Sequence, residues 1–332
     1  MRSIILLSAL MSGLCLGQPA AAAPSRDDAS SIDHVLLWGR SIDQVSAVMT
    51  VKLGFQVRPG RNPDGVANRY VRMSDGSYVE LEGITRPDAR MDPGMRTDQV
   101  ALRGGPGART FGLRSSTLDR ERVSLRQRGF APTEIFSAAP NDPDGDGPSA
   151  PPRWRLFAFE RQPLSSNLFF IDYAAGRPTP TRVADARSAR VHPNGARGLS
   201  AIWLLSSNAE ADRQQLAAMG FAGATPVSVA QVGARGYCVP IHRKRVLVLQ
   251  PDGAGIAADA LRSGGPQVLG ISVAVADIAS ARRQVERGYE KPLAGYRGLL
   301  GPSFLAPTRE DLGLLVEFHA GSGVAATSPC SG

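Results

Sequence analysis

Two kinds of side chain that bind metals or transfer protons stand in strand-like runs near the start of the chain, with His34 in the first run and Glu80 and Glu82 in a later one. Side chains alternate across a strand, so Glu80 and Glu82 share one face. His34 and Glu80 point into one hollow if their apolar neighbours pack on a helix. An imidazole nitrogen beside a carboxylate oxygen suits Zn, Fe, Mn or Ni, and a carboxylate can also transfer a proton. We therefore take His34 and Glu80 as candidate ligands of one divalent metal, and Glu80 and Glu82 as candidate catalytic residues.

The same three residues also have a purely structural interpretation. One His and one Glu bind a metal weakly by themselves, so a hydrogen-bonded His34 without a metal is an equal alternative. Charged carboxylates are rarely buried, which favours a solvated or Arg-paired Glu82 over a metal ligand.

A second carboxylate and imidazole stand near the C-terminal end. Glu317 and His319 lie two residues apart in a strand-like run and so share a face, which makes Glu317 a further candidate metal ligand. The runs expected to face it, 199–205 and 246–250, contain neither His nor carboxylate. This second set is therefore incomplete, and an exposed sheet edge is the alternative interpretation.

Three further residues are candidate substrate-binding groups. Arg114, at the end of the run 110–114, can bind an anionic carboxylate. Asn68, in the run before Glu80, is a candidate polar anchor, and the indole of Trp38 offers an apolar wall. Hydrogen bonding at the surface is the alternative for Asn68 and Arg114.

A calcium-loop pattern is present but incomplete. Asp142, Asp144 and Asp146 alternate with Pro and Gly as at the start of an EF-hand loop, whereas Arg153 stands where the closing Glu is required. A solvated turn is the default expectation for this segment.

A repeated turn organises the elements that must position these residues. A Gly followed by an aromatic residue ends a predicted helix four times, at 54–55, 129–130, 220–221 and 288–289. A left-handed Gly closes the last helical carbonyls, and the aromatic residue packs back on the helix. Each pair follows a strand-like run and an amphipathic helix and precedes further strands, which predicts one β-α-β unit repeated four times. One unit cannot bury its sheet face alone, so we expect the units to pair into two cups.

The pattern of residues 1–22 is that of a signal peptide. A positive start is followed by an apolar run too short to cross a bilayer and by small residues before an expected cleavage near Ala22. We then expect a first domain at 31–175, a polar linker at 176–197, a second domain at 198–320 and a loose tail at 321–332. These features predict a protein of the periplasm or the medium without a transmembrane segment.

The net charge limits the kinds of molecule that the protein can bind, and the cysteine content bears on disulfide formation. The formal net charge is +8, carried by scattered arginines rather than by a basic stripe. This distribution argues against nucleic-acid binding and is compatible with a small anionic ligand. Removal of the signal leaves Cys238 and Cys330, which could form a disulfide in an oxidising compartment or remain unpaired.

The first unit resembles the vicinal oxygen chelate superfamily, which includes glyoxalase I, extradiol dioxygenases and bleomycin-resistance proteins. The resemblance lies in residues 32–37 (IDHVLL), 53–55 (LGF), 78–82 (YVELE), 192–195 (HPNG), 304–307 (FLAP) and 313–318 (GLLVEF). It implies an α+β fold in which paired βαβββ modules form two cupped mixed β-sheets with helices packed outside. It also implies a divalent metal bound by His34 and Glu80, although the matching strand of the second unit has no His.

Two functions follow from these observations. The first is an exported glyoxalase-like protein that binds a small oxygen-rich substrate in a sheet cup, with or without one divalent metal for lyase, isomerase or dioxygenase chemistry. The alternative is a metal-free small-molecule binding or sequestering protein of the bleomycin-resistance type, which the incomplete ligand sets favour.

Overall fold

The computed structural model describes residues 30–61, 65–91, 95, 98, 102–140, 145–176, 179–321 and 330. The expected signal peptide, Asp142 and Asp144 of the calcium-like loop, and most of the expected tail lie outside these residues. Among the described residues, no helix is long and apolar enough to cross a bilayer.

The first unit shows how the sequence sets the element boundaries. In chain order it contains β1 (Ser31–Trp38), α1 (Ile42–Ala47) with a following π-helical turn (Val48–Lys52), β2 (Arg58–Pro59), β3 (Val66–Arg72) and β4 (Tyr78–Ile84). Helix α1 begins after Ser41, whose hydroxyl accepts a hydrogen bond from the amide of Gln44 at 3.1 Å. Val45 and Met49 bury the apolar stripe that the sequence predicts.

The other three units repeat this order. The second contains β5 (Gly107–Arg114), α3 (Leu118–Gln127), β6 (Phe136–Ser137), β7 (Trp154–Phe157) and β8 (Asn167–Tyr173). The third contains β9 (Ala196–Leu205), α5 (Ala209–Ala218), β10 (Thr225–Val229), β11 (Ala234–Ile241) and β12 (Lys244–Pro251). The fourth contains β13 (Gln267–Val275), α7 (Ile278–Tyr289), β14 (Gly295–Gly298), β15 (Gly301–Ala306) and β16 (Leu315–Ala320).

Shorter helices connect the units. Helix α4 (Pro180–Ser188) precedes the third unit, α6 (Ile256–Gly264) separates the third from the fourth, and α8 (Arg309–Leu312) precedes β16. Two 3-10 turns lie at Leu102–Gly104 and Ala230–Val232.

The units pair two by two into two curved mixed sheets. Their strand orders are β2-β3-β4-β1-β5-β8-β7-β6 and β10-β11-β12-β9-β13-β16-β15-β14. In each sheet the two central strands, β1 with β5 and β9 with β13, run antiparallel, and each pairs in parallel with the last strand of its own unit. One residue pair, Val268 with Ala108, joins the two sheets. The predicted α+β fold with paired modules and two cupped sheets is therefore confirmed.

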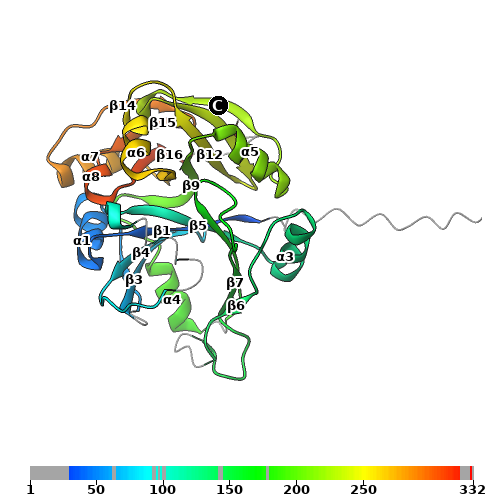
Figure 1. Ribbon diagram of the computed structural model, residues 1–332. Helices are drawn as coiled ribbons and strands as arrows, with labels where there is room; N and C mark the ends of the chain where they lie inside the picture. The colour runs from blue at the N-terminus through cyan, green and yellow to red at the C-terminus, as the bar shows by residue number, and fades with distance from the viewer. Residues whose placement is uncertain are drawn as a thin grey trace, which may run out of the picture.

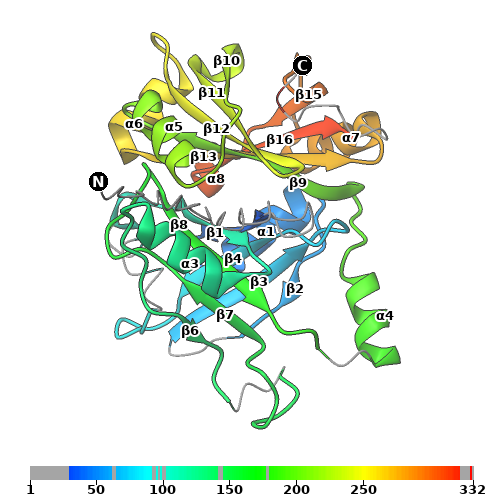
Figure 2. The same ribbon diagram turned by 90° about the vertical axis from the view of Figure 1, so that its right-hand side faces the viewer.

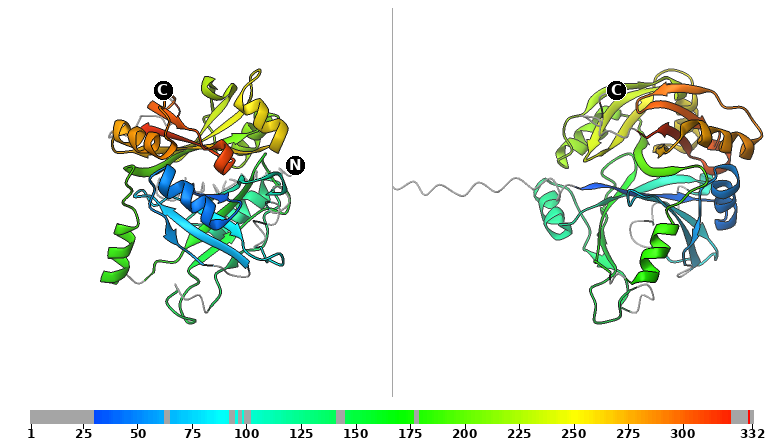
Figure 3. Two further views of the ribbon diagram at one scale, coloured as in Figure 1. Left: turned by 90° about the vertical axis from the view of Figure 1, so that its left-hand side faces the viewer. Right: turned by 180° about the vertical axis from the view of Figure 1, so that it is seen from behind.

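The two sheets stack with the faces that carry α1, α3, α5 and α7 toward each other, whereas α6 packs on the opposite face of the C-terminal sheet (Figures 1 and 2). One continuous apolar core joins residues of both sheets, including Leu37 of β1 and Leu204 of β9. Helices α1 and α7 lie at one side of this core, and α3 and α5 at the other (Figure 3). The opposite faces of the sheets form the cups, which consequently face away from each other.

Three of the four Gly-aromatic turns form as predicted, and the fourth does not. Gly54, Gly129 and Gly220 have left-handed φ angles of 72°, 88° and 105°. Gly288 instead lies inside α7, and Glu290 takes the left-handed conformation with φ 50°. Helix α7 crosses the π-helical turn here, and a Cβ on Gly288 would lie only 2.2 Å from the carbonyl oxygen of Lys52. Glycine is therefore required at 288 for close backbone approach and not for a turn.

The segment predicted as a polar linker, 176–197, contains helix α4. Thr179 caps the helix by accepting a hydrogen bond from the amide of Arg182 at 3.2 Å, and Pro180 occupies the first turn. A Thr-Pro pair at this position is a signal for the start of a helix. Helix α4 has no buried residue, which explains why hydrophobic periodicity does not reveal it.

The two cysteines of the described residues form a disulfide. Cys238 of β11 is bonded to Cys330, with their Cα atoms 5.7 Å apart. The bond closes a sequence separation of 92 residues and attaches the end of the chain to the C-terminal sheet. This contact decides between the two alternatives that spacing alone left open.

His192 fixes the chain between the two sheets. Its Nδ1 accepts a hydrogen bond from the amide of Gln56 at 3.0 Å, and its Nε2 donates to the carbonyl of Arg72 at 2.9 Å. Asn194 continues the contact by donating to the carbonyl of Leu53 at 2.8 Å. Burial lowers the pKa of His192, and the hydrogen bond to Arg72 only partly offsets this effect. The neutral imidazole is therefore the form that supports the fold.

A pH-dependent loss of stability follows from this contact. The unfolded chain binds a proton at an ordinary histidine pKa of about 6.5, whereas the folded chain does so only at lower pH. The stabilising contribution is therefore present above this value and is lost as the pH falls below it. We expect the free energy of unfolding, measured in urea, to fall more between pH 7.5 and pH 5.5 in the wild type than in His192→Ala. Equal pH dependence in the two proteins would contradict this role.

Candidate active site in the N-terminal cup

A β-bulge in β1 brings two consecutive side chains to the cup. Ile32 pairs with Leu113 and His34 with Gly112, so Asp33 is left out of the pairing between β1 and β5. A bulge of this kind re-aims a side chain that regular alternation would send to the opposite face. Asp33 and His34 are each only 2% exposed.

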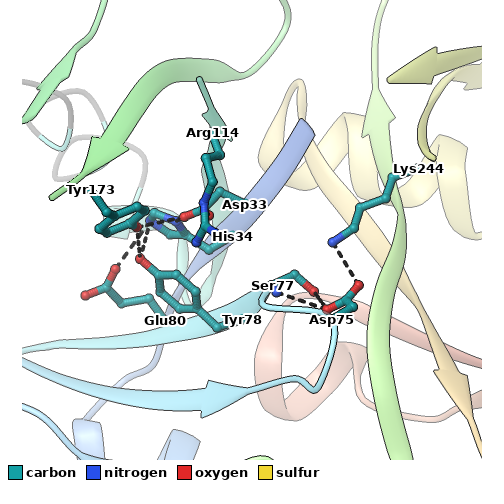
Figure 4. Close-up of polar contacts among 9 residues, drawn as sticks. All are labelled: Asp33, His34, Asp75, Ser77, Tyr78, Glu80, Arg114, Tyr173 and Lys244. Carbon is teal, nitrogen blue, oxygen red and sulfur yellow. Dashed lines mark hydrogen bonds and ion pairs between the residues drawn. The ribbon is translucent and has the colours of Figure 1, made fainter. Parts of the chain in front are cut away.

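Asp33 accepts hydrogen bonds from three different residues (Figure 4). Its Oδ2 lies 2.7 Å from His34 Nδ1 and 2.8 Å from the hydroxyl of Tyr173. Its Oδ1 lies 2.8 Å from Nε and 2.7 Å from Nη2 of Arg114. Burial alone would raise the pKa of Asp33, but the hydrogen bond and charge of His34 and the charge of Arg114 outweigh it and lower this pKa. Asp33 is thus held ionised.

The other nitrogen of His34 faces Glu80 and Tyr78. Nε2 lies 3.4 Å from Glu80 Oε2 and 3.4 Å from the hydroxyl of Tyr78. The ring of Tyr78 stacks on the imidazole with centroids 4.2 Å apart. Because Asp33 fixes Nδ1, the ring is oriented with Nε2 toward the carboxylate (Figure 4).

Glu80 is a half-buried carboxylate, with its side chain 13% exposed, and it has a raised pKa. Burial is the main cause, and the charge of His34 and the hydrogen bond from Tyr70 offset it only in part. The amide of Asn68 donates to Glu80 Oε1 at 3.2 Å. A carboxylate with a raised pKa is suited to accept and release protons near neutral pH.

The structure brings some predicted residues together and separates others. His34, Glu80 and Asn68 form one cluster as the strand alternation predicts. Glu82 lies next on the same face of β4, beside Trp38 of β1. It is only 2% exposed, so it is not a solvated surface carboxylate.

Arg114 and Trp38 occupy the cup with partners of the protein itself. Arg114 binds Asp33 and lies over the ring of Tyr173 at 4.8 Å. The indole of Trp38 is fully buried and donates to Asp98 at 3.0 Å. Their roles toward a substrate stay predictions.

Glu317 does not join His34 and Glu80. It lies on β16 in the C-terminal sheet, where it accepts hydrogen bonds from Ser272 and Tyr296, each at 2.6 Å. The predicted metal set of His34, Glu80 and Glu317 is therefore divided between the two cups.

Two acidic residues of the cup escape the sequence prediction. Asp33 is missed because alternation assigns it to the helix face, and the bulge depends on the pairing with β5. Asp98 lies in the segment between the first two units, which shows no regular pattern. It accepts hydrogen bonds from Trp38, from Thr110 at 2.8 Å and from Asn167 at 2.9 Å. Burial raises the pKa of Asp98 despite these bonds.

A link between the sheets lies beside the cluster. Lys244 of β12 contacts Asp75 Oδ2 at 3.0 Å, in the hairpin that leads into β4 (Figure 4). Ser77 of the same hairpin donates to Asp75 Oδ1. The position of the strand that carries Tyr78 and Glu80 is therefore tied to the C-terminal sheet.

The donor set does not fit a resident divalent metal. The strand positions beside His34 are Gly112 on β5 and, next to it, Phe169 on β8. The ring of Phe169 lies 5.0 Å from the imidazole, and a Cβ on Gly112 would come within 2.6 Å of that ring. In the part of the chain that the structure describes, no three His, Cys, Asp or Glu side chains are grouped for a metal. One imidazole and one carboxylate in contact with each other are fewer than the three protein ligands typical of such sites.

A family model described as a glyoxalase-like domain matches residues 32–220. This match covers more than half of the chain and includes β1, β4 and the His34 cluster. The chain belongs to the glyoxalase-like family. No curated protein sequence matches it.

Solved structures agree with this family at the level of the fold. The glyoxalase-like chain is similar to a mutant of 4-hydroxymandelate synthase from Streptomyces coelicolor, with TM-score 0.60 and 12% identity over 90% of this chain and 95% of that one. It is also similar to 2,2',3-trihydroxybiphenyl 1,2-dioxygenase from Sphingomonas wittichii, with TM-score 0.55 and 12% identity over 88% and 91% of the two chains. A catechol 2,3-dioxygenase gives TM-score 0.52 and 14% identity over 89% and 94%. At these identities the similarity shows the shared fold alone.

The incomplete donor set predicts weak metal binding by this glyoxalase-like cup. A metal present at 100 times its Kd would stabilise the fold by about 2.7 kcal/mol. We expect no rise of the unfolding temperature when Zn²⁺, Mn²⁺, Fe²⁺ or Ni²⁺ is added to EDTA-treated protein, measured by scanning calorimetry. A saturable rise in the wild type that disappears in His34→Asn would show that the metal interpretation is correct.

Proposed function

We propose that the N-terminal cup of this glyoxalase-like protein binds a small oxygen-rich molecule and transfers a proton to or from it without a resident metal. Glu80 is the acid–base group in this proposal, and Asp33 with His34 forms the relay behind it. The proposal rests on one observation: the buried imidazole of His34 lies between the carboxylates of Asp33 and Glu80. The pKa of Asp33 is lowered, whereas the pKa of Glu80 is raised.

The proton path follows from the contacts of His34 with the two carboxylates. A ligand proton is taken by Glu80, whose Oε2 lies 3.4 Å from His34 Nε2. His34 can share that proton because Asp33, ionised and 2.7 Å from Nδ1, stabilises an imidazolium. Such a pair of carboxyl groups with shifted pKa values in opposite directions is typical of acid–base sites. The reaction class that suits it is proton abstraction next to a carbonyl.

The polar groups around the cluster favour a ligand with several oxygen atoms. Tyr70, Tyr78 and Tyr173 present hydroxyls on the same side as Glu80, and Asn68 presents an amide. The second N–H of the Asn68 amide can donate to a ligand oxygen, and the tyrosine oxygens can accept hydrogen bonds from ligand hydroxyls. The walls contributed by Phe169 and Leu36 are apolar and exclude water.

Binding is tested with oxygen-rich probes named by the structural neighbours, catechol and 4-hydroxymandelate. We expect at least one of them to raise the unfolding temperature of the wild type and to lose this effect in His34→Asn. The matched control is His242→Asn, because His242 lies in an exposed turn with φ 56°, a conformation that Asn accepts. The binding proposal is wrong if neither probe shifts the wild type, or if His34→Asn retains the shift.

Proton transfer is tested separately with dihydroxyacetone in D₂O. We expect the wild type to accelerate exchange of the ligand C–H protons, observed by NMR, and Glu80→Gln to lose at least about tenfold of this rate. A wild type that binds the oxygen-rich probes but does not exchange protons would leave the sequestering function and exclude this chemistry.

Export is also part of the proposal. It is supported by the signal-like pattern of residues 1–22 and by the disulfide between Cys238 and Cys330, since disulfides persist in oxidising compartments. We expect the mature protein to begin at Ala23, which N-terminal sequencing of the native material would measure. A mature protein that retains Met1 would contradict export by this route.

A further inference from the structure

A cavity lies between helix α7 and the hairpin of β14 and β15, at one end of the C-terminal sheet. Helix α7 packs on β15 there (Figure 2). The cavity has a volume of about 390 Å³, which is within the range of small-molecule sites. It is separate from the N-terminal cup, because all of its lining residues belong to the fourth unit.

Alternation along β14 decides which of its side chains lie on the α7 side of the sheet. Tyr296 turns to the cup face, where its hydroxyl donates to a carboxylate of β16. Gly295 and Arg297 therefore belong to the face that α7 covers, and they pair with Phe304 and Pro302 of β15. These four residues all line the cavity.

The floor of the cavity is apolar. Phe304 is fully buried, and Ile278 of α7 packs against the same apolar core. Pro302 and Ala279 continue this lining to the exposed rim. Such walls favour a ligand with an apolar body, because binding removes hydrocarbon surface from water.

Gly295 leaves space beside the guanidinium group of Arg282. A Cβ at position 295 would lie 3.1 Å from Arg282 Nη1, which is closer than ordinary van der Waals contact. Glycine therefore allows the backbone of β14 to approach the guanidinium group, and a larger side chain at this position would fill part of the cavity.

Two guanidinium groups and no carboxylate are among the described residues that line the cavity. Arg282 Nε lies 3.8 Å from Glu286 Oε1, too far for a hydrogen bond, and this oxygen accepts one from the amide of Leu293 at 3.0 Å. Arg297 is exposed, and none of the carboxylates that the structure describes forms an ion pair with it. The capping carboxylate of Asp277 binds amides of α7 itself. The lining is therefore positively charged.

We propose that this cavity is a second ligand site, for a small monocarboxylate with an aromatic or branched apolar body. The carboxylate binds Arg282 and Arg297, because a guanidinium group gives a carboxylate two parallel hydrogen bonds. The apolar body lies against Phe304 and Ile278. A ligand that lacks either the charge or the apolar body loses one of these two contributions and binds more weakly. The site does not depend on the function proposed for the N-terminal cup.

The test uses phenylacetate, phenylacetamide and acetate as probes of the full-length protein in isothermal titration calorimetry. We expect phenylacetate to bind the wild type more tightly than phenylacetamide, which has the same shape without the charge, and than acetate, which lacks the ring. Arg282→Ala is expected to weaken phenylacetate binding at least about tenfold, and Arg282→Lys to restore part of it. Gly295→Val is expected to weaken binding by filling the cavity while both arginines remain.

The matched control is Arg283→Ala, which removes the adjacent, exposed arginine of α7 and is expected to leave phenylacetate binding unchanged. Binding should also persist in His34→Asn, which separates this site from the N-terminal cup. Circular dichroism checks the fold of each variant before titration, and Gly295→Val keeps the test valid if Arg282→Ala does not fold. The proposal is overturned if phenylacetate does not bind the wild type, if it binds Arg282→Ala or Gly295→Val as tightly, or if phenylacetamide binds as tightly as phenylacetate.

Discussion

The hydrogen bond between Asp33 and His34 is the contact on which the polar end of the N-terminal cup depends. A carboxylate that is 2% exposed is stable only when donors replace the lost water, and Asp33 finds them in His34, Tyr173 and Arg114. The same bonds fix the imidazole ring and direct its free nitrogen to Glu80. The cluster thus has one carboxyl group with a lowered pKa, Asp33, and one with a raised pKa, Glu80, and this difference is the basis of the proposed chemistry.

The bulge that creates this contact recurs in the third unit. In β9, Leu199 pairs with Val273 and Ala201 with Ser272, so Ser200 is left out of the pairing as Asp33 is in β1. Strands β1 and β9 therefore each present two consecutive side chains to their cup. In the first cup they are a carboxylate and an imidazole, and in the second they are a hydroxyl and a methyl group. The same backbone irregularity therefore carries a charged pair in one cup and two small side chains in the other, where Ala201 is fully buried against α6.

The sequence reveals the parts of the structure that depend on local rules. Alternation places His34 and Glu80 on one face because β1 and β4 are regular neighbours at these positions, and the repeated turns reveal the four units. Alternation does not place Asp33 in the cup, because the bulge depends on which strand pairs with β1. Gly288 follows the same sequence pattern as the other three glycines but serves a contact with Lys52, which is remote in sequence. Features that depend on contacts between segments distant in sequence therefore cannot be predicted from local sequence patterns.

Phe169 connects the missing metal ligands to the proposed acid–base chemistry. Its ring occupies the position beside Gly112 where a donor would be needed to complete a metal set, and it lies edge-on to His34. A ring at this place also removes water from the cluster, and a low local dielectric strengthens the interaction of Asp33 with His34. The same desolvation is the main cause of the raised pKa of Glu80. One packing contact therefore accounts both for the position that lacks a metal donor and for part of the burial that raises the pKa of Glu80, on which the proposed proton transfer depends.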